Sequence, residues 1–587
     1  MLNPARASLY CCGLMLTLPL LQPYHRFPLT SFYSEWLAFA LGLLAALLLL
    51  RRQPGPVARY PTVALAPLCL ILLLAVHAAL GRVPYPEQAL IATLYLLWAA
   101  LIVVLGHRLG KELGLHEVAD TLAWFMLAGG LVNALAGLIQ HYNVDTPIAY
   151  LVARKASAAV FGNLAQPNQY AAHIAMALAS AAFLFARRRL GIFVAIACAA
   201  ILLLVSALSG SRSPWLYFTA LPALAWLIHR SSRDEQGTRL VVFTILLLPG
   251  FLLAQGVATL MATPAVEQVT SIQRVFESAS GVAVRFKLLT DAWHMFLAAP
   301  FLGSGWGQFS WHHFLSQAAT GATGGPPLFN HAHNLVLHLL AETGLVGFVI
   351  VFGAAVVWLA GLRTVAFNAD WWWLLAVLSV IGIHSMLEYP LWYSLFLGPA
   401  ALLLGIGAQH VLNVRFQGVL RLTVVACILA GSLYLFGALA PYRTFERVVF
   451  SPQSGSLART DERAFLAAIS DVHREPLLTP YVELAIAHGV TVSRDSLAEK
   501  VDLTRRAMHF APVAVVVYRH ALLLALAGEK TAALQQLQQA IQVYPAELGE
   551  VIVRLEALAR AHPVEFTPLL ELAAAKSAER RAPAARR

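Results

Sequence analysis

Two closely spaced histidines are the residues of this chain best suited to chemistry. Residues 330–334 read NHAHN, which places His331 and His333 two positions apart. A neutral imidazole can accept a proton from a hydroxyl group near neutral pH, so either histidine could act as a general base. Two other roles stay open: capping a helix at the interface, or binding a metal, since HxH is a known ligand spacing. Without an adjacent carboxylate or an HExxH pattern, we predict no metal.

Two arginines are candidates for binding phosphate. Arg285 begins the stretch 285–309, and Arg212 lies in SGSRSP at residues 209–214. The guanidinium group has a planar fork of donors that matches phosphate oxygens. A pyrophosphate site is one interpretation, if both arginines lie on the same side of a membrane as the histidines. An arginine at the head-group level can also simply reach lipid phosphate.

Two further segments carry polar side chains. Gln166 and Asn168 lie in FGNLAQPNQY at residues 161–170, and side-chain amides suit sugar hydroxyls because they both donate and accept. An ordinary turn before a helix is the alternative. Residues 384–393 read HSMLEYPLWY, in which Glu388 could orient an external base or an arginine. The aromatic residues there, Tyr389 among them, are typical of an interfacial belt.

The elements that must position these residues are membrane-spanning helices. The chain is 59% hydrophobic and 12% charged, against about 25% charged in soluble proteins. It therefore has too little polar surface to face water on all sides. A span needs about 20 apolar residues. We predict thirteen: Ala7–Leu21, Trp36–Leu50, Val63–Leu80, Ala89–Leu105, Thr121–Gln140, Tyr170–Phe185, Leu190–Leu208, Trp215–Ile228, Leu240–Met261, Leu335–Leu362, Trp371–Leu387, Trp392–Ala408 and Leu422–Leu439.

The positive charges predict the orientation of these spans. Loops that are rich in Lys and Arg alternate along the chain with loops that contain few of them. If the N-terminus is cytoplasmic, the Lys- and Arg-rich loops are cytoplasmic as well. The segments with the histidines, Arg212 and Arg285 then lie outside, as do the loop at about 262–334 and the tail after residue 441. The net charge of +11 follows from this bias, so we expect no nucleic-acid partner. All five cysteines lie in apolar runs, and no disulfide framework is expected.

The tail is predicted to form a helical domain at residues 442–575. Residues 511–545 have small and apolar residues at helical spacing, a Gly-Glu turn in the middle and a terminal Pro. This length and pattern resemble one tetratricopeptide repeat, and the flanks resemble degenerate hairpins. Such a surface suits protein contact, although a plain helical domain is the alternative. Residues 576–587 are basic and Ala-rich, and we expect them to be disordered. The predicted fold is thus an all-α transmembrane bundle, residues 1–441, with a helical-repeat domain.

Four segments, taken in order, resemble one family. The stretch 285–309, with PxxGxG at residues 300–305, and HNxxLxxLxExGxxG at residues 333–347 are similar to the core of the O-antigen ligase and polymerase superfamily. Residues 161–169 and the EYPLWY segment within 384–393 resemble its branch of PglL-type protein O-oligosaccharyltransferases. The resemblance covers nearly the whole chain, and the four motifs together are more specific than each alone.

This resemblance implies an enzyme of the Gram-negative inner membrane with its active site and C-terminal domain in the periplasm. Such enzymes transfer a preassembled oligosaccharide from an undecaprenyl-diphosphate carrier to a hydroxyl group, without a cofactor or a metal. The acceptor is Ser or Thr of a protein, often a pilin, in the PglL branch. In the ligase branch it is a sugar of lipid A–core, and in the polymerase branch another repeat unit. A transporter or scaffold without chemistry is a further alternative.

The family's site residues map onto matching positions of this chain. His333 corresponds to the essential loop histidine, and Arg212 and Arg285 to arginines that hold the diphosphate; His331 beside His333 leaves open which imidazole acts. The residues expected in supporting or acceptor-side roles are His331, Asn334, Gln166, Asn168, Glu388 and Tyr389.

Overall fold

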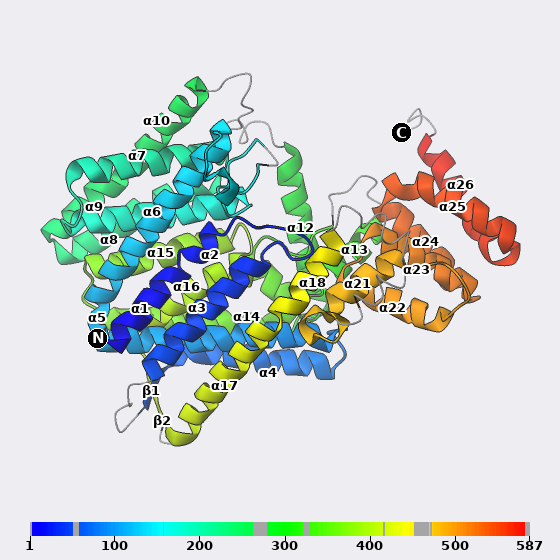
Figure 1. Cartoon of the computed structure of the whole chain (residues 1–587), viewed down its shortest axis with the longest axis horizontal. Coiled ribbons are helices and arrows are strands. Elements are labelled where there is room, and N and C mark those ends of the chain that lie inside the picture. The colour runs from blue at the N-terminus through cyan, green and yellow to red at the C-terminus, as the bar shows by residue number, and fades with distance from the viewer. Residues whose placement is uncertain are drawn as a thin grey trace.

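The chain forms an all-α bundle with a separate helical domain at one end (Figure 1). The computed structural model describes residues 3–50, 58–155, 158–261, 279–320, 328–414, 417–450, 469 and 472–581. The helices of the bundle are α1 (Pro4–Met15), α2 (Leu18–Leu21), α3 (Phe32–Leu50), α4 (Leu65–Ala79), α5 (Pro86–Tyr142), α6 (Pro167–Ala186), α7 (Ile192–Leu208), α8 (Ser213–Ser232), α9 (Glu235–Ile245), α10 (Leu247–Leu260), α14 (Leu335–Gly361), α15 (Ala369–Ser385), α16 (Ser394–Ile406) and α17 (Gln417–Gly437).

The predicted spans fall on these helices, with three differences. The first span is divided between α1 and α2. The fourth and fifth spans are two helices that meet at Gly114 and share the label α5; the backbone of Gly114 (φ 79°, ψ 152°) is not helical. The segment predicted as a loop between them contains this break, and the residues on either side of it are helical, since Leu, Arg, Lys and Glu are good helix formers. The ninth span is divided between α9 and α10.

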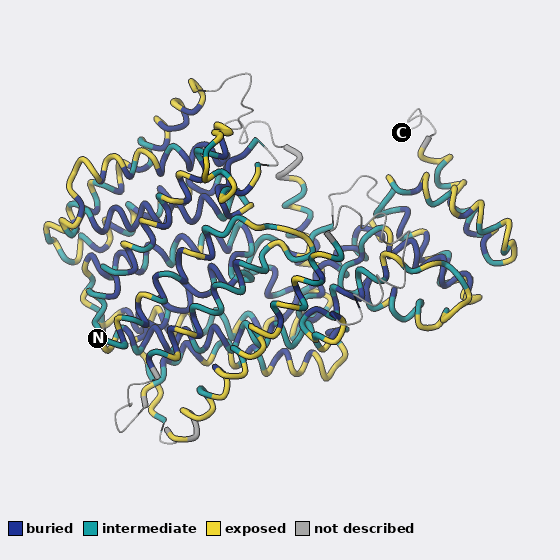
Figure 2. Tube along the Cα trace, viewed as in Figure 1, coloured by how far each residue is buried: buried dark blue, intermediate teal, exposed yellow. Residues whose placement is uncertain are grey.

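By length and composition, eight helices in the described part of the chain can cross a membrane. The shorter apolar helices α7, α15 and α16 pack among them. Large apolar residues are also exposed on the bundle: Phe193 is 85% exposed and Leu260 is 87% exposed. Figure 2 shows exposed residues in yellow along the outer helices. Apolar surface of this extent is unfavourable in water and suits lipid. The protein is therefore a multi-pass, all-α membrane protein.

The α6 helix forms the centre of the bundle. Its sequence is rich in alanine, and 16 of its 20 residues are buried. Small side chains allow neighbouring backbones to approach closely, as membrane helices require. At Gly130 of α5, for example, an added Cβ would lie 2.2 Å from the Cβ of Ala177. The α5, α7, α8, α9 and α15 helices all pack against α6, so its N-terminal end has a fixed position among them.

Segments that the charge pattern assigns to the cytoplasmic side lie together. The strands β1 (Ala58–Pro61) and β2 (Val411–Val414) pair antiparallel, although more than 300 residues separate them. Ion pairs also join such segments: Arg187 to Asp370 at 2.8 Å, and Arg189 to Asp120 at 3.3 Å. This grouping is what a consistent inside–outside alternation requires.

The described part of the predicted loop at 262–334 contains two helices. These are α12 (Ala279–Ala298) and α13 (Phe309–Thr320), while residues 262–278 and 321–327 lie outside the described residues. The α13 helix packs against the C-terminal domain, whose core includes the fully buried Phe314. In Figure 1 this domain lies at the end of the bundle farthest from the N-terminus.

The C-terminal region is a series of helical hairpins. It comprises α18 (Leu439–Phe450), α21 (Thr479–Gly489), α22 (Leu497–Phe510), α23 (Ala514–Leu526), α24 (Lys530–Val543), α25 (Leu548–Ala561) and α26 (Pro563–Arg581). The α23–α24 pair coincides with the predicted repeat unit, and Gly528 (φ 84°) makes its turn. The assignment to tetratricopeptide repeats stays a prediction. The first residues of the predicted disordered tail belong to α26, and residues 582–587 lie outside the described part.

Candidate active site

A hydrogen-bonded histidine and glutamate form the centre of the site. The Nδ1 atom of His333 lies 2.6 Å from Oε2 of Glu388. His333 has a left-handed backbone (φ 52°), which is uncommon for a residue other than glycine and frequent at functional sites. Its side chain is 18% exposed, so the ring can still meet a substrate. When Nδ1–H donates to the carboxylate, Nε2 keeps the lone pair that accepts a proton.

Asn334 holds the two loops of this pair together. It is the N-cap of α14, where its Oδ1 accepts a hydrogen bond of 3.0 Å from the backbone N–H of Leu337. Its Nδ2 donates to the carbonyl of Met386 at 3.3 Å. An Asn at an N-cap satisfies a backbone donor that the helix leaves free. The same side chain therefore begins the helix after His333 and ties it to the loop that carries Glu388.

Glu388 also contacts both other groups of predicted site residues. Its Oε1 accepts a hydrogen bond of 2.7 Å from Nδ2 of Asn168, and it lies 3.5 Å from Nη2 of Arg285. Glu388 is buried, which raises its pKa, but the hydrogen bond and charge of His333, with His384 and Arg285, more than offset this. The net pKa of Glu388 is lowered, and the group is a carboxylate near neutral pH.

Asn168 extends the network to the segment with Arg212. Its Oδ1 accepts a hydrogen bond of 2.7 Å from the hydroxyl of Ser211, which also lies 2.9 Å from the hydroxyl of Ser213. Arg212, between these two serines, is the half-buried N-cap of α8. The α6, α8 and α14 helices thus begin around one point, and helix N-termini carry partial positive charge that favours anions.

His331 has a different environment from His333. It is 5% exposed, and its ring is parallel to that of Tyr389, with centroids 4.4 Å apart. The ring of His338 lies 3.6 Å away on centroids. Burial lowers the pKa of His331 well below its usual value, and the neighbouring His338 and His333 lower it further. A neutral, enclosed ring of this kind supports the loop by packing, whereas His333 has the carboxylate partner and the access.

Glu342 organises the glycine-rich loop rather than the site itself. Its carboxylate accepts hydrogen bonds from the backbone N–H groups of Gly307 (2.8 Å) and Phe309 (3.0 Å). Gly344 interrupts α14 at φ 61°, and the freed carbonyls of Ala341 and Glu342 accept from the N–H groups of Ser304 and Gly305. The motifs at residues 300–305 and 342–344 are therefore one packing unit between α12 and α14.

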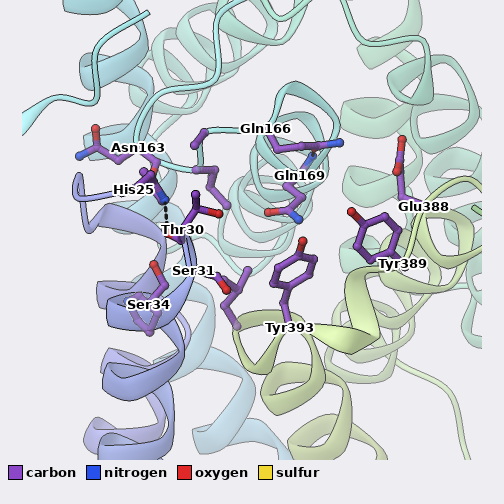
Figure 3. Close-up of a pocket in the computed structure, with 14 residues that line it drawn as sticks. His25, Thr30, Ser31, Ser34, Asn163, Gln166, Gln169, Glu388, Tyr389 and Tyr393 are labelled. Carbon is purple, nitrogen blue, oxygen red and sulfur yellow. Dashed lines mark hydrogen bonds between the residues drawn. The ribbon is translucent and has the colours of Figure 1, made fainter. Parts of the chain in front are cut away.

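A cavity of about 180 Å³ opens beside Glu388 (Figure 3). Gln166 lines it on one side, as the N-cap residue of α6. Tyr389 and Tyr393 line another side with stacked rings, whose centroids are 5.7 Å apart. The segment between α2 and α3 adds a further polar wall with His25, Thr30 and Ser31, and none of these was among the predicted site residues. The sequence could have indicated this segment, because it is a short loop on the same predicted side of the membrane as His333.

Within the described residues, no group of three or more His, Cys, Asp or Glu side chains could hold a metal ion. His331 and His333 differ in their surroundings: His331 stacks on Tyr389, while His333 bonds to Glu388. The HxH spacing in the sequence thus does not bring two imidazoles to one shared point.

Comparisons with known proteins give two family matches and two relatives. A family model described as O-Antigen ligase matches residues 197–352, and one described as Virulence factor membrane-bound polymerase, C-terminal, matches residues 372–554. The chain is 28% identical over 404 residues to the General O-oligosaccharyltransferase of Acinetobacter baylyi, which covers 67% of this chain and 68% of that protein. It is 23% identical over 331 residues to the ComP-specific O-oligosaccharyltransferase of the same organism, covering 55% and 57%.

Fold and site together define a multi-pass membrane glycosyltransferase with a histidine–glutamate pair at its centre. The family matches and the two relatives support an O-oligosaccharyltransferase of the PglL type, similar to the O-antigen ligases and polymerases. The O-Antigen ligase model covers Arg212, Arg285 and His333, and the second model covers Glu388.

Proposed function

We propose that this enzyme transfers a preassembled oligosaccharide from an undecaprenyl-diphosphate carrier to Ser or Thr hydroxyls of periplasmic proteins such as a pilin. The His333–Glu388 hydrogen bond, with Arg285 on the same carboxylate, is the observation that carries the proposal. The similarity to two O-oligosaccharyltransferases supports the kind of acceptor. We also place the site and the C-terminal domain on the periplasmic side of the inner membrane, as the charge alternation predicts.

In this mechanism His333 is the general base. Glu388 accepts Nδ1–H, which orients the ring, leaves Nε2 free to take the proton of the acceptor hydroxyl, and stabilises the imidazolium that results. The acceptor oxygen forms a bond to the anomeric carbon, and the bond from that carbon to the diphosphate oxygen breaks. We expect attack in line with the departing group, so the product has the inverted anomeric configuration; a retained configuration would exclude this step.

The leaving diphosphate needs positive charge close by. Arg285 and Arg212 supply guanidinium groups, and the N-termini of α6, α8 and α14 add partial positive charge. Because Arg285 is 43% exposed and 3.5 Å from Glu388, its guanidinium can turn toward a bound phosphate, while Glu388 keeps its hydrogen bonds to His333 and Asn168. The sugar–phosphate bond is already activated, so the reaction needs no further source of energy.

The proposal is tested by transfer in a host that lacks its own enzyme. The host supplies a lipid-linked oligosaccharide, a candidate pilin and this chain, either wild type or His333→Ala. We expect a mass shift of the pilin with wild type and none with His333→Ala, at equal levels of protein in the membrane. Full activity of His333→Ala would assign the base to another residue, with His331→Ala as the next variant to assay.

O-antigen ligation or polymerisation is the second candidate function, and the two family-model matches are the observation that favours it. The same chain is expressed in a strain that lacks its O-antigen ligase. Restored O-antigen on lipid A–core, together with an unmodified pilin in the first assay, would replace protein glycosylation by ligation. A change in O-antigen chain length would indicate polymerisation.

A further inference from the structure

We propose that the cavity beside Glu388 binds the sugar of the donor nearest the bond that breaks, and that it selects a neutral or acetamido sugar over an acidic one. The proposal rests on the proposed function, since it concerns the donor of that reaction. It makes the segment between α2 and α3 part of donor recognition.

The side chains around the cavity suit the hydroxyl groups of a sugar. Thr30, Ser31 and Ser34 provide hydroxyls from one wall, while Gln166 and Gln169 provide amides from the other. Hydroxyls and amides both donate and accept, which is the pattern that a sugar ring presents. In Figure 3 the hydroxyl groups of Tyr389 and Tyr393 point toward Gln169 across the cavity.

The cavity lies next to the place where the sugar–phosphate bond of the donor would break. Glu388 belongs both to the cavity wall and to the hydrogen bond with His333. Neither Arg285 nor Arg212 is among the described residues that line it. A donor whose diphosphate lies against Arg285 would therefore place its first sugar toward the cavity, on the other side of the Glu388 carboxylate.

The size and polarity of the cavity exclude other parts of the substrates. At about 180 Å³ it is smaller than the roughly 300–1,000 Å³ of pockets for drug-sized ligands, so it holds one ring rather than several. A polyprenyl chain would require an apolar channel. An extended acceptor peptide would require a long groove with partners for its backbone groups.

Charge gives the cavity its selectivity. Glu388, a carboxylate of lowered pKa, is on its wall, and no Lys or Arg is present among its described lining residues. A uronic acid would bring a second carboxylate close to Glu388, with no Lys or Arg among the described lining residues to pair with it. Like charges placed together are strongly unfavourable at a recognition site.

The walls are held in place before any substrate binds. His25 lies between two segments, with Nε2 2.7 Å from the carbonyl oxygen of Asn163 and Nδ1 3.0 Å from that of Thr30. Asn163 is itself fixed, because its Nδ2 donates to the carbonyls of Leu21 and Leu151 at 2.8 Å. A site that is ordered in advance loses less entropy on binding, which favours its role in recognition.

The experiment compares two lipid-linked donors that differ only in the first sugar, one acetamido and one uronic acid. The full-length enzyme is assayed as wild type, Ser31→Arg and Gln169→Leu, with donor and acceptor peptide varied separately. Ser231→Arg is the matched control, since Ser231 is exposed at the far end of α8. Ser31→Arg adds a cation to the cavity, and Gln169→Leu removes an amide without adding bulk.

We expect wild type and Ser231→Arg to prefer the acetamido donor by roughly tenfold or more in kcat/KM. Ser31→Arg should reduce that ratio about tenfold by accepting the uronate donor, a gain that misfolding cannot produce. Gln169→Leu should raise the KM for the acetamido donor about tenfold and leave the KM for the peptide unchanged.

Three outcomes are distinguishable. Wild-type transfer with a donor ratio that Ser31→Arg does not change would overturn the cavity assignment and leave the proposed function intact. A raised KM for the peptide in Gln169→Leu would assign the cavity to the acceptor instead. Absence of protein glycosylation in wild type with either donor would overturn the proposed function itself.

Discussion

Glu388 links three kinds of residue that the proposed reaction uses. It bonds to His333, accepts from Asn168 and lies beside Arg285, although these residues come from four different segments of the chain. The sequence suggested that Glu388 could orient either a base or an arginine, and in the structure it contacts both. Its role depends on charge, because a carboxylate stabilises an imidazolium and a neutral amide does not.

Glu388→Gln should therefore reduce the transfer rate by about 10²–10³-fold, within the range of general acid–base effects. Binding of the lipid-linked donor and the level of protein in the membrane should change little. Steady-state transfer to an acceptor peptide measures the effect. Glu235→Gln is the matched control, because Glu235 pairs with Arg188 at an exposed site elsewhere. Equal rates for the two variants would remove Glu388 from the mechanism.

A second prediction for a single residue concerns His331 and how the stability of the folded protein depends on pH. Because its pKa in the folded protein is depressed, the unfolded chain binds a proton on this ring below about pH 6.5 while the folded protein does not. Stability should therefore fall as the pH falls from about 6.5 toward the folded pKa. In His331→Asn this dependence should be weaker by about 1.4 kcal/mol per pH unit between pH 6 and 5.

Thermal unfolding in detergent at several pH values measures this slope. Between pH 7 and 8 the slopes of the two proteins should agree, since neither folded nor unfolded His331 titrates there, and this range is the internal control. Parallel slopes between pH 6 and 5 would mean that His331 becomes protonated in the folded protein.

Among the elements, α14 and the loop before α13 determine each other's geometry. The interruption of α14 at Gly344 turns two carbonyls toward the loop, and the Glu342 carboxylate holds the loop's far end. A Cβ at Gly344 would lie 2.4 Å from the backbone carbon of Phe301. The backbone angles of Gly344 (φ 61°, ψ −162°) are in a region that glycine alone adopts readily.

Gly344→Ala should lower the free energy of unfolding by at least about 2 kcal/mol, from strain and the clash together. Gly353→Ala in the same helix is the control: a Cβ there meets nothing within 4 Å, and it should be neutral or stabilising by up to about 1 kcal/mol. The melting temperatures of both variants in detergent measure the two effects on stability. Similar melting temperatures would show that the break in α14 is not required.

At the scale of the whole molecule, α13 joins the C-terminal domain to the site. Phe314 of α13 is fully buried in the core of that domain, and Trp311 lies 4.3 Å from His509 on ring centroids. On the bundle side, His313 bonds to Asp291 of α12 at 2.8 Å, and α12 carries Arg285. The domain and Arg285 are thus connected through the two packed helices α12 and α13 (Figure 1).

Phe314→Ala should destabilise this junction by about 3–5 kcal/mol, as for other large-to-small changes in a core. Hydrogen exchange of the α13 and α24 amides should become faster, while that of α6 stays slow. Phe193→Ala is the control, because Phe193 is 85% exposed on the bundle surface. Unchanged exchange in α13 would mean that the domain docks through other contacts.

The spans and the grouping of the site residues on one side of the bundle could be predicted from the sequence. A membrane helix needs a local run of about 20 apolar residues, and Lys and Arg are enriched at cytoplasmic ends. The position and the orientation of a span therefore both depend on short stretches of sequence. Residue type and spacing made His333, Arg212, Arg285 and Glu388 candidates, and the family resemblance assigned roles to His333 and the two arginines. The connection between the fourth and fifth spans is shorter than predicted, because helix continues on both sides of the break at Gly114.

The pairings within the site came only from the tertiary structure. His333 and Glu388 are 55 residues apart, and His25 reaches Asn163 across 138 residues. No local pattern determines such contacts, because they depend on how α6 and its neighbours pack. The different roles of His331 and His333 arise in the same way: the two are alike in sequence, and burial encloses one ring while the other keeps a carboxylate partner and access to substrate.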